Sequence, residues 1–218
     1  MSTDKKAMNN LDKNIALGHK FENSVIDSLT MAFHNKNEHN IKRYTGTQTD
    51  IENGTDMTYN RINVDITANF KNKTNMPFII PTRIKATNEH YFSLGIRTGN
   101  NHNGYTEFND IVIVLGINMH NNQYNKHTDE IYGNIAYYAE DIATAISDAY
   151  EIYNCMIDYS ADKNSLSDTE LKNISKLQIN PNTHKYRKIG PNVRKLINLA
   201  KENNFKTADI EEYSASRR

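Results

Sequence analysis

The chain has 218 residues, enough for one large domain or for one domain with an appendage. Its 26 basic and 26 acidic side chains cancel, which argues against a uniformly basic, sequence-independent nucleic-acid coat but leaves a local basic patch open. The single cysteine, Cys155, excludes a disulfide within the chain and favours a reducing, cytoplasmic setting. The polar first residues lack the apolar region of a signal peptide, and no apolar run reaches the length of a membrane span, so we expect no membrane partner.

A helix is predicted over residues 14–33, because Phe21, Val25 and Leu29 recur at helical spacing. Glu22 belongs to the same helix and is drawn toward its buried side. The segment 34–53 that follows is polar and is expected to end in a loop rich in Gly, Asn and Asp.

A block rich in strands comes next. Strands are expected at residues 57–60, 61–70, 78–84, 91–97 and 111–117. The clearest is 61–70, where apolar and polar residues alternate, so that Asp65 and Thr67 share the polar face. The continuous apolar run at 111–117 is typical of a strand buried on both faces.

The rest of the chain is predicted to be a polar loop at 118–129 and then mainly helical. A broad apolar stripe predicts a helix over 138–159, Ser167 and Glu170 form a capping-box pattern, and Pro191 suits the first turn of a last helix. We therefore expect an α/β (or α+β) fold whose central mixed sheet is flanked by helices. Residues 1–13 would be a flexible N-terminus, 14–160 the core domain and 161–218 a small helical C-terminal extension.

Two carboxylates stand out in the strand block. Asp65 lies in the middle of a strand, where Asp is uncommon, and Asp56 follows a turn-like Gly54-Thr55. If the two residues converge across a hairpin, their oxygens suit Mg²⁺ or Mn²⁺. Glu22 could then add a third carboxylate or orient a metal-bound water. Taken singly, Asp65 could also be a solvent-face residue, Asp56 a turn residue and Glu22 a helix-surface acid.

A cation would be needed beside such a metal to stabilise a phosphate. Thr67 shares the strand face of Asp65 and can hydrogen-bond a water or phosphate, but it carries no positive charge. Lys71 lies on the same face at the far end of the strand, and Lys85 and Arg97 lie on neighbouring strands.

The order of these elements, a helix with Glu22, then Gly54-Thr55-Asp56, then Val64-Asp65-Ile66-Thr67, resembles the PD-(D/E)xK nuclease superfamily, which has the restriction-endonuclease-like fold. The resemblance implies an αβββαβ core and Mg²⁺-dependent cleavage of DNA. By resemblance, Glu22 matches the acid of the first helix, Asp56 the first motif aspartate and Asp65 the acid of the half-motif. This chain has Thr67 where the family has lysine, so Lys71, Lys85 or Arg97 would replace that lysine.

The leading hypothesis is therefore a metal-dependent endonuclease that hydrolyses DNA, and a homodimer is a further expectation because nucleases of this fold often pair to cut two strands. One alternative is a catalytically inactive protein on the same fold that binds nucleic acid or another protein. Another is a small phage-type inhibitor whose carboxylates bind a basic partner.

Overall fold

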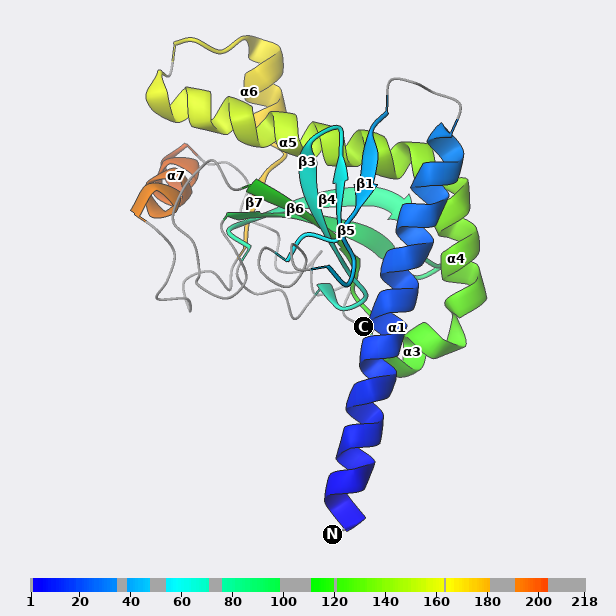
Figure 1. Ribbon diagram of the computed structural model, residues 1–218. Helices are drawn as coiled ribbons and strands as arrows, with labels where there is room; N and C mark the ends of the chain where they lie inside the picture. The colour runs from blue at the N-terminus through cyan, green and yellow to red at the C-terminus, as the bar shows by residue number, and fades with distance from the viewer. Residues whose placement is uncertain are drawn as a thin grey trace.

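The computed structural model describes residues 2–34, 39–47, 54–70, 76–98, 111–119, 121–162, 164–180 and 191–203. A seven-stranded sheet lies at the centre of these residues, in the spatial order β1-β2-β3-β6-β5-β4-β7 (Figure 1). Its strands are β1 (Ile41–Arg43), β2 (Met57–Tyr59), β3 (Ile62–Thr67), β4 (Phe78–Lys85), β5 (Tyr91–Thr98), β6 (Ile111–Ile117) and β7 (Gln178–Ile179). β3 and β6 are parallel, and the other neighbouring pairs are antiparallel.

The helices surround this sheet. They are α1 (Ser2–Phe33), α3 (Asn121–Lys126), α4 (Thr128–Tyr137), α5 (Ala139–Ala161), α6 (Asp168–Ile174) and α7 (Pro191–Glu202). The fold is thus mixed α/β with a mixed central sheet, as the sequence predicts. Between β3 and β6 the described residues form the strands β4 and β5, whereas an αβββαβ order places a helix before its last strand. The finer, restriction-endonuclease-like part of the fold therefore stays a prediction.

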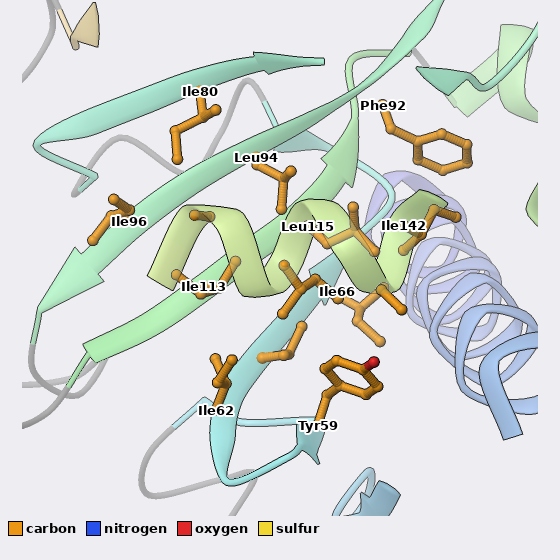
Figure 2. Close-up of a cluster of buried hydrophobic side chains, with 14 of the residues drawn as sticks. Tyr59, Ile62, Ile66, Ile80, Phe92, Leu94, Ile96, Ile113, Leu115 and Ile142 are labelled. Atoms are coloured by element: carbon orange, nitrogen blue, oxygen red, sulfur yellow. The ribbon is translucent and has the colours of Figure 1, made fainter. Parts of the chain in front are cut away.

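One face of the sheet carries the main hydrophobic core. Alternate residues of each strand point to this face, where α1 and α5 pack against them. Figure 2 shows the core residues that it labels on β3, β5 and β6 together with Ile142 of α5. β6 is buried throughout its length, which confirms the interpretation of its continuous apolar run.

The opposite face of the sheet has a smaller apolar cluster, formed by Phe70, Met76, Ile79 and Val114. Glycines let this cluster lie close to the strands. A Cβ on Gly95 would collide with the Met76 side chain, and a Cβ on Gly116 would lie 2.5 Å from the carbonyl oxygen of Thr67. This second face also carries Asp65, because Ile62, Val64 and Ile66 of the same strand belong to the main core.

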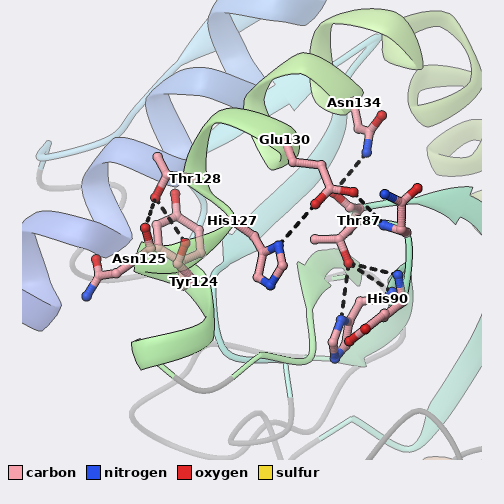
Figure 3. A network of polar contacts seen from close by, with 11 residues as sticks. Thr87, His90, Tyr124, Asn125, His127, Thr128, Glu130 and Asn134 are labelled. Atoms are coloured by element: carbon pink, nitrogen blue, oxygen red, sulfur yellow. Dashed lines mark hydrogen bonds and ion pairs between the residues drawn. The ribbon is translucent and has the colours of Figure 1, made fainter.

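The turn between β4 and β5 is fastened to α4 by polar contacts, as Figure 3 shows. Glu130 accepts a hydrogen bond from the backbone N–H of Asn88 at 2.6 Å, and the Asn134 side-chain amide donates to the carbonyl of Ala86 at 3.1 Å. His127 lies 3.0 Å from the other carboxylate oxygen of Glu130. Backbone groups of the turn thus have partners on α4, whereas the buried side chains of Thr87 and His90 contact each other at 3.2 Å.

Several predicted boundaries are wrong. α1 begins at Ser2, so the N-terminus expected to be flexible is helical, and its first half projects away from the rest of the fold (Figure 1). α3 and the first two residues of α4 occupy residues predicted as a polar loop, and the sequence predicts no element over the rest of α4. Only Ile131 and Ile135 of α4 are buried apolar residues, and the polar remainder conceals the helical period.

The division at residue 160 also has no counterpart in the packing. β7 lies beyond that boundary and pairs with β4 at the edge of the main sheet. Ile174, Leu177 and Leu196 are buried in the same core as α1 and α5. The C-terminal segment is thus part of the core and is not only helical. None of the described helices combines the length and apolar character needed to cross a membrane.

Candidate functional site

A two-residue turn sets the geometry of the candidate site. Asn60 and Arg61 have φ values of 48° and 70°, which is the left-handed conformation that short hairpins require, and they join β2 to β3. The resulting register pairs Met57 with Val64. Asp56 directly precedes β2, and its N–H donates to the carbonyl of Val64 at 2.9 Å, so Asp56 lies beside the part of β3 that carries Asp65.

Hydrogen bonds to both the side chain and the backbone of Asp56 hold it in place. It is 4% exposed, and its Oδ2 accepts a hydrogen bond from the Ile66 N–H at 2.6 Å. Its carbonyl accepts hydrogen bonds from the N–H groups of Tyr44 and Thr45, at 2.6 and 3.1 Å. The preceding Gly54 has a φ of 57°, a conformation that glycine adopts without strain, and so the chain can turn into β2 at this point.

Arg97 reaches the same place from β5. It is fully buried, with an exposed fraction of 0%, and its Nη2 lies 3.5 Å from Oδ2 of Asp65, which is 4% exposed. The same Nη2 donates to the carbonyl of Gly54 at 2.8 Å. Burial lowers the pKa of Arg97, and the charges of Asp65 and Asp56 oppose that shift.

We call these three residues the Asp56–Asp65–Arg97 cluster. Its members come from three segments: the Arg97 guanidinium contacts Asp65, and the charges of Asp65 and Asp56 both act on Arg97. When all three groups are ionised, the cluster carries one net negative charge. Because the removal of one partner from a buried ion pair leaves an uncompensated charge, each member depends on the others.

Glu22 does not join this cluster. α1 packs on the main-core face of the sheet, whereas Asp65 projects on the opposite face, so the sheet separates the two carboxylates. The Glu22 carboxylate lies 2.9 Å from Nδ1 of His19 on its own helix. Over the described ranges, no three His, Cys, Asp or Glu side chains come together in a way that could hold a metal ion. The expected third carboxylate is therefore not in place.

The other predicted residues are distributed as follows. Thr67 lies on the second face, where its hydroxyl accepts a hydrogen bond from the Asn69 N–H at 3.2 Å and its methyl group faces Gly116. Lys85 is exposed and pairs with Tyr91, at the opposite end of β5 from Arg97. Six residues along a strand span about 20 Å, which places Lys85 out of reach of the cluster. Lys71 lies outside the described residues.

Two further groups near the cluster were not predicted from the sequence. Gly95 pairs with Val114, which in turn pairs with Asp65, so a residue without a side chain lies in the same cross-strand row as the carboxylate. The Gly54 carbonyl is the second partner of Arg97. Glycine inside a predicted strand is the one signal that could have pointed to a close approach at Gly95.

Comparisons of the chain with protein-family models, with curated proteins and with solved structures find no match.

Proposed function

We propose that this protein is a Mg²⁺-dependent nuclease that hydrolyses DNA at the Asp56–Asp65–Arg97 cluster. The observation that carries the proposal is that two carboxylates and one guanidinium lie near one another, with Arg97 3.5 Å from Asp65 and Asp56 hydrogen-bonded to Ile66, the next residue of β3. Two acids on adjacent strands and a nearby cation are the groups that the resemblance to the PD-(D/E)xK superfamily calls for. In this proposal Arg97, and not Lys85, takes the place of the motif lysine.

The donor set fits a divalent cation. Mg²⁺ is typically held by one or two carboxylates, with water and substrate oxygens completing its coordination, so Asp56 and Asp65 suffice without Glu22. The negative charge of the cluster favours a cation further. When bound, Mg²⁺ would polarise the phosphodiester and lower the pKa of a water.

The remaining chemistry falls to side chains of the chain. The Arg97 guanidinium has five donors in a planar fork, of which Nη2 contacts both Gly54 and Asp65. A guanidinium in this position stabilises the negative charge that develops on a phosphate during hydrolysis. The Thr67 hydroxyl accepts from Asn69, which leaves its own proton to donate to a water or a phosphate oxygen.

One observation favours the second candidate, a catalytically inactive protein on the same fold. Asp56 and Asp65 are each 4% exposed and Arg97 is 0% exposed, so the cluster can equally act as a buried ion pair that holds β2, β3 and β5 together. Such a protein would bind nucleic acid or a protein partner through another surface. The same buried cluster argues against the phage-type inhibitor, whose acids would form an exposed face.

The two candidates differ in an incubation experiment. Supercoiled plasmid, single-stranded DNA and RNA are incubated with the full chain and Mg²⁺, Mn²⁺ or EDTA. The nuclease predicts nicking or linearisation of plasmid that requires the metal and stops with EDTA. An unchanged plasmid under all metal conditions would favour the inactive protein.

Asp65→Asn is the matching variant. We expect it to reduce Mg²⁺-dependent cleavage by at least about 100-fold, because it removes one of two metal ligands without changing side-chain volume. Asp141→Asn, which neutralises an exposed acid on α5, serves as the control and should cleave like the wild type. Circular dichroism verifies that both variants are folded. Full cleavage by folded Asp65→Asn would rule out this site.

A further inference from the structure

We propose that Arg97 acts as an internal counter-ion that competes with the metal for the carboxylates of Asp56 and Asp65. In the metal-free protein the guanidinium neutralises the acid pair, and a divalent cation binds only as the Arg97–Asp65 ion pair opens. The metal affinity of the site is then set by Arg97. This inference rests on the proposed metal-dependent function and concerns the regulation of that site.

The positive charge of Arg97 lies where a metal ion would bind Asp65. Arg97 projects from β5 toward β3, and its Nη2 lies 3.5 Å from Oδ2 of Asp65, one of the oxygens that a metal would need. The charge of Asp56 also acts on Arg97. A guanidinium and a metal ion at this position would repel each other, since like charges a few ångströms apart interact strongly where water is excluded.

Arg97 and Asp65 are both buried, which strengthens the attraction between them. Arg97 and Asp65 have exposed fractions of 0% and 4%, so solvent screens their attraction weakly. Without metal, the two acids would be a pair of like charges in a site of low dielectric, which is unfavourable unless a cation is present. Arg97 supplies that cation through its contact with Asp65, so the acid pair has a counter-ion without metal.

A second hydrogen bond can hold the Arg97 guanidinium near the site when its contact with Asp65 opens. Its Nη2 also donates to the carbonyl of Gly54, at 2.8 Å, which is a neutral partner next to the turn that leads into Asp56. If the contact with Asp65 opens, this hydrogen bond can keep the guanidinium at the edge of the site. In that position the guanidinium would be close enough to contact a phosphate group bound to the metal.

The test measures metal binding without nucleic acid, so that it is independent of cleavage. Mn²⁺ is titrated into the full chain and bound Mn²⁺ is followed by electron paramagnetic resonance, while thermal melts are recorded in EDTA and in Mn²⁺. We expect Arg97→Gln to bind Mn²⁺ at least about tenfold more tightly than the wild type. The variant should melt at a lower temperature than the wild type in EDTA, and Mn²⁺ should raise its melting temperature by more than it raises that of the wild type. Arg83→Gln, which removes an exposed arginine from β4, should behave like the wild type.

A second measurement covers the case in which Arg97→Gln does not fold. Side-chain NMR of ¹⁵N-arginine in the wild type follows the Arg97 guanidinium, assigned with Arg97→Lys. Saturating Mg²⁺ should shift this signal, while the signal of Arg43, which is paired with Asp27 at the surface, should stay in place. An Arg97 signal that does not move, or an Arg97→Gln variant that binds Mn²⁺ no more tightly than the wild type, would overturn the inference. Metal-dependent cleavage by the wild type would still uphold the proposed function in that case.

Discussion

Apolar side chains pack closely against the second face of the sheet because two strand residues there are glycines. Gly95 lies in the same cross-strand row as Asp65, and Gly116 lies in the row of Thr67. Phe70 and Met76 fill the space that these glycines leave, and Val114 of the same apolar cluster pairs with Asp65. An apolar neighbour strengthens each charge interaction in the cluster, because it keeps water away.

Gly116→Ala should destabilise the protein. The new Cβ would lie 2.5 Å from the Thr67 carbonyl oxygen, and a backbone atom cannot move aside as a flexible side chain does. We expect the free energy of unfolding to fall by about 1–3 kcal/mol, measured by urea denaturation. Gly133→Ala is the matched control, since a Cβ at this helical position meets nothing within 4 Å. It should raise stability by about 0.5–1 kcal/mol. Equal effects of the two substitutions would contradict this interpretation.

The β2–β3 hairpin shows which parts of the site could be read from the sequence. The alternation in residues 61–70 predicts β3 and places Asp65 and Thr67 on one face, and the structure confirms both. The approach of Asp56 to β3, where it bonds Val64 and Ile66, requires the hairpin register, which is fixed by a turn at Asn60-Arg61 that lacks the usual glycine signal.

Contacts between elements that are distant in the sequence also could not be predicted, because they depend on the strand order and on which face of the sheet a helix covers. Arg97 was one of three candidate cations, and only the strand order β3-β6-β5 selects it over Lys85. Glu22 was placed near the acids because its side of α1 is apolar, but a helix can cover either face of a sheet. The strands β1 and β7, of three and two residues, are too short to show a period.

Arg61→Gly should stabilise the hairpin. Arg61 has a φ of 70°, and a residue with a Cβ pays about 1–2 kcal/mol in this conformation. Glycine removes that strain but adds freedom to the unfolded chain, so we expect a net gain of about 0.5–1 kcal/mol in the free energy of unfolding. The contrasting variant is Asn60→Val, because Asn60 tolerates a φ of 48° and its side chain accepts a hydrogen bond from the Asn40 N–H at 2.8 Å. Thermal melts should rise for Arg61→Gly and fall for Asn60→Val, and a fall in both would refute the strain argument.

The segments before and after residue 160 share one hydrophobic core, although the sequence suggests a division there. α6 and α7 both contact α5, and β7 extends the sheet beyond β4. The pairing of β7 also buries Asn180, whose N–H donates to the carbonyl of Pro77 at 2.9 Å. The edge that carries β4 is therefore covered by the C-terminal part of the chain, far in sequence from Asp56 and Asp65.

A chain that ends at Asp162 should therefore fail to fold cooperatively. The truncation removes buried Ile174, Leu177 and Leu196, and each buried aliphatic side chain contributes about 1.5–3 kcal/mol, so their combined loss approaches the 5–15 kcal/mol that stabilises a typical domain. In urea, the full chain should unfold in one transition that coincides in circular dichroism and tyrosine fluorescence, whereas the truncated chain should show a broad change or none. Leu196→Ala, a milder change in the same core, should keep one transition and lose about 2–5 kcal/mol. A truncated chain that unfolds as sharply as the full chain, and at the same urea concentration, would establish residues 1–162 as an independent domain.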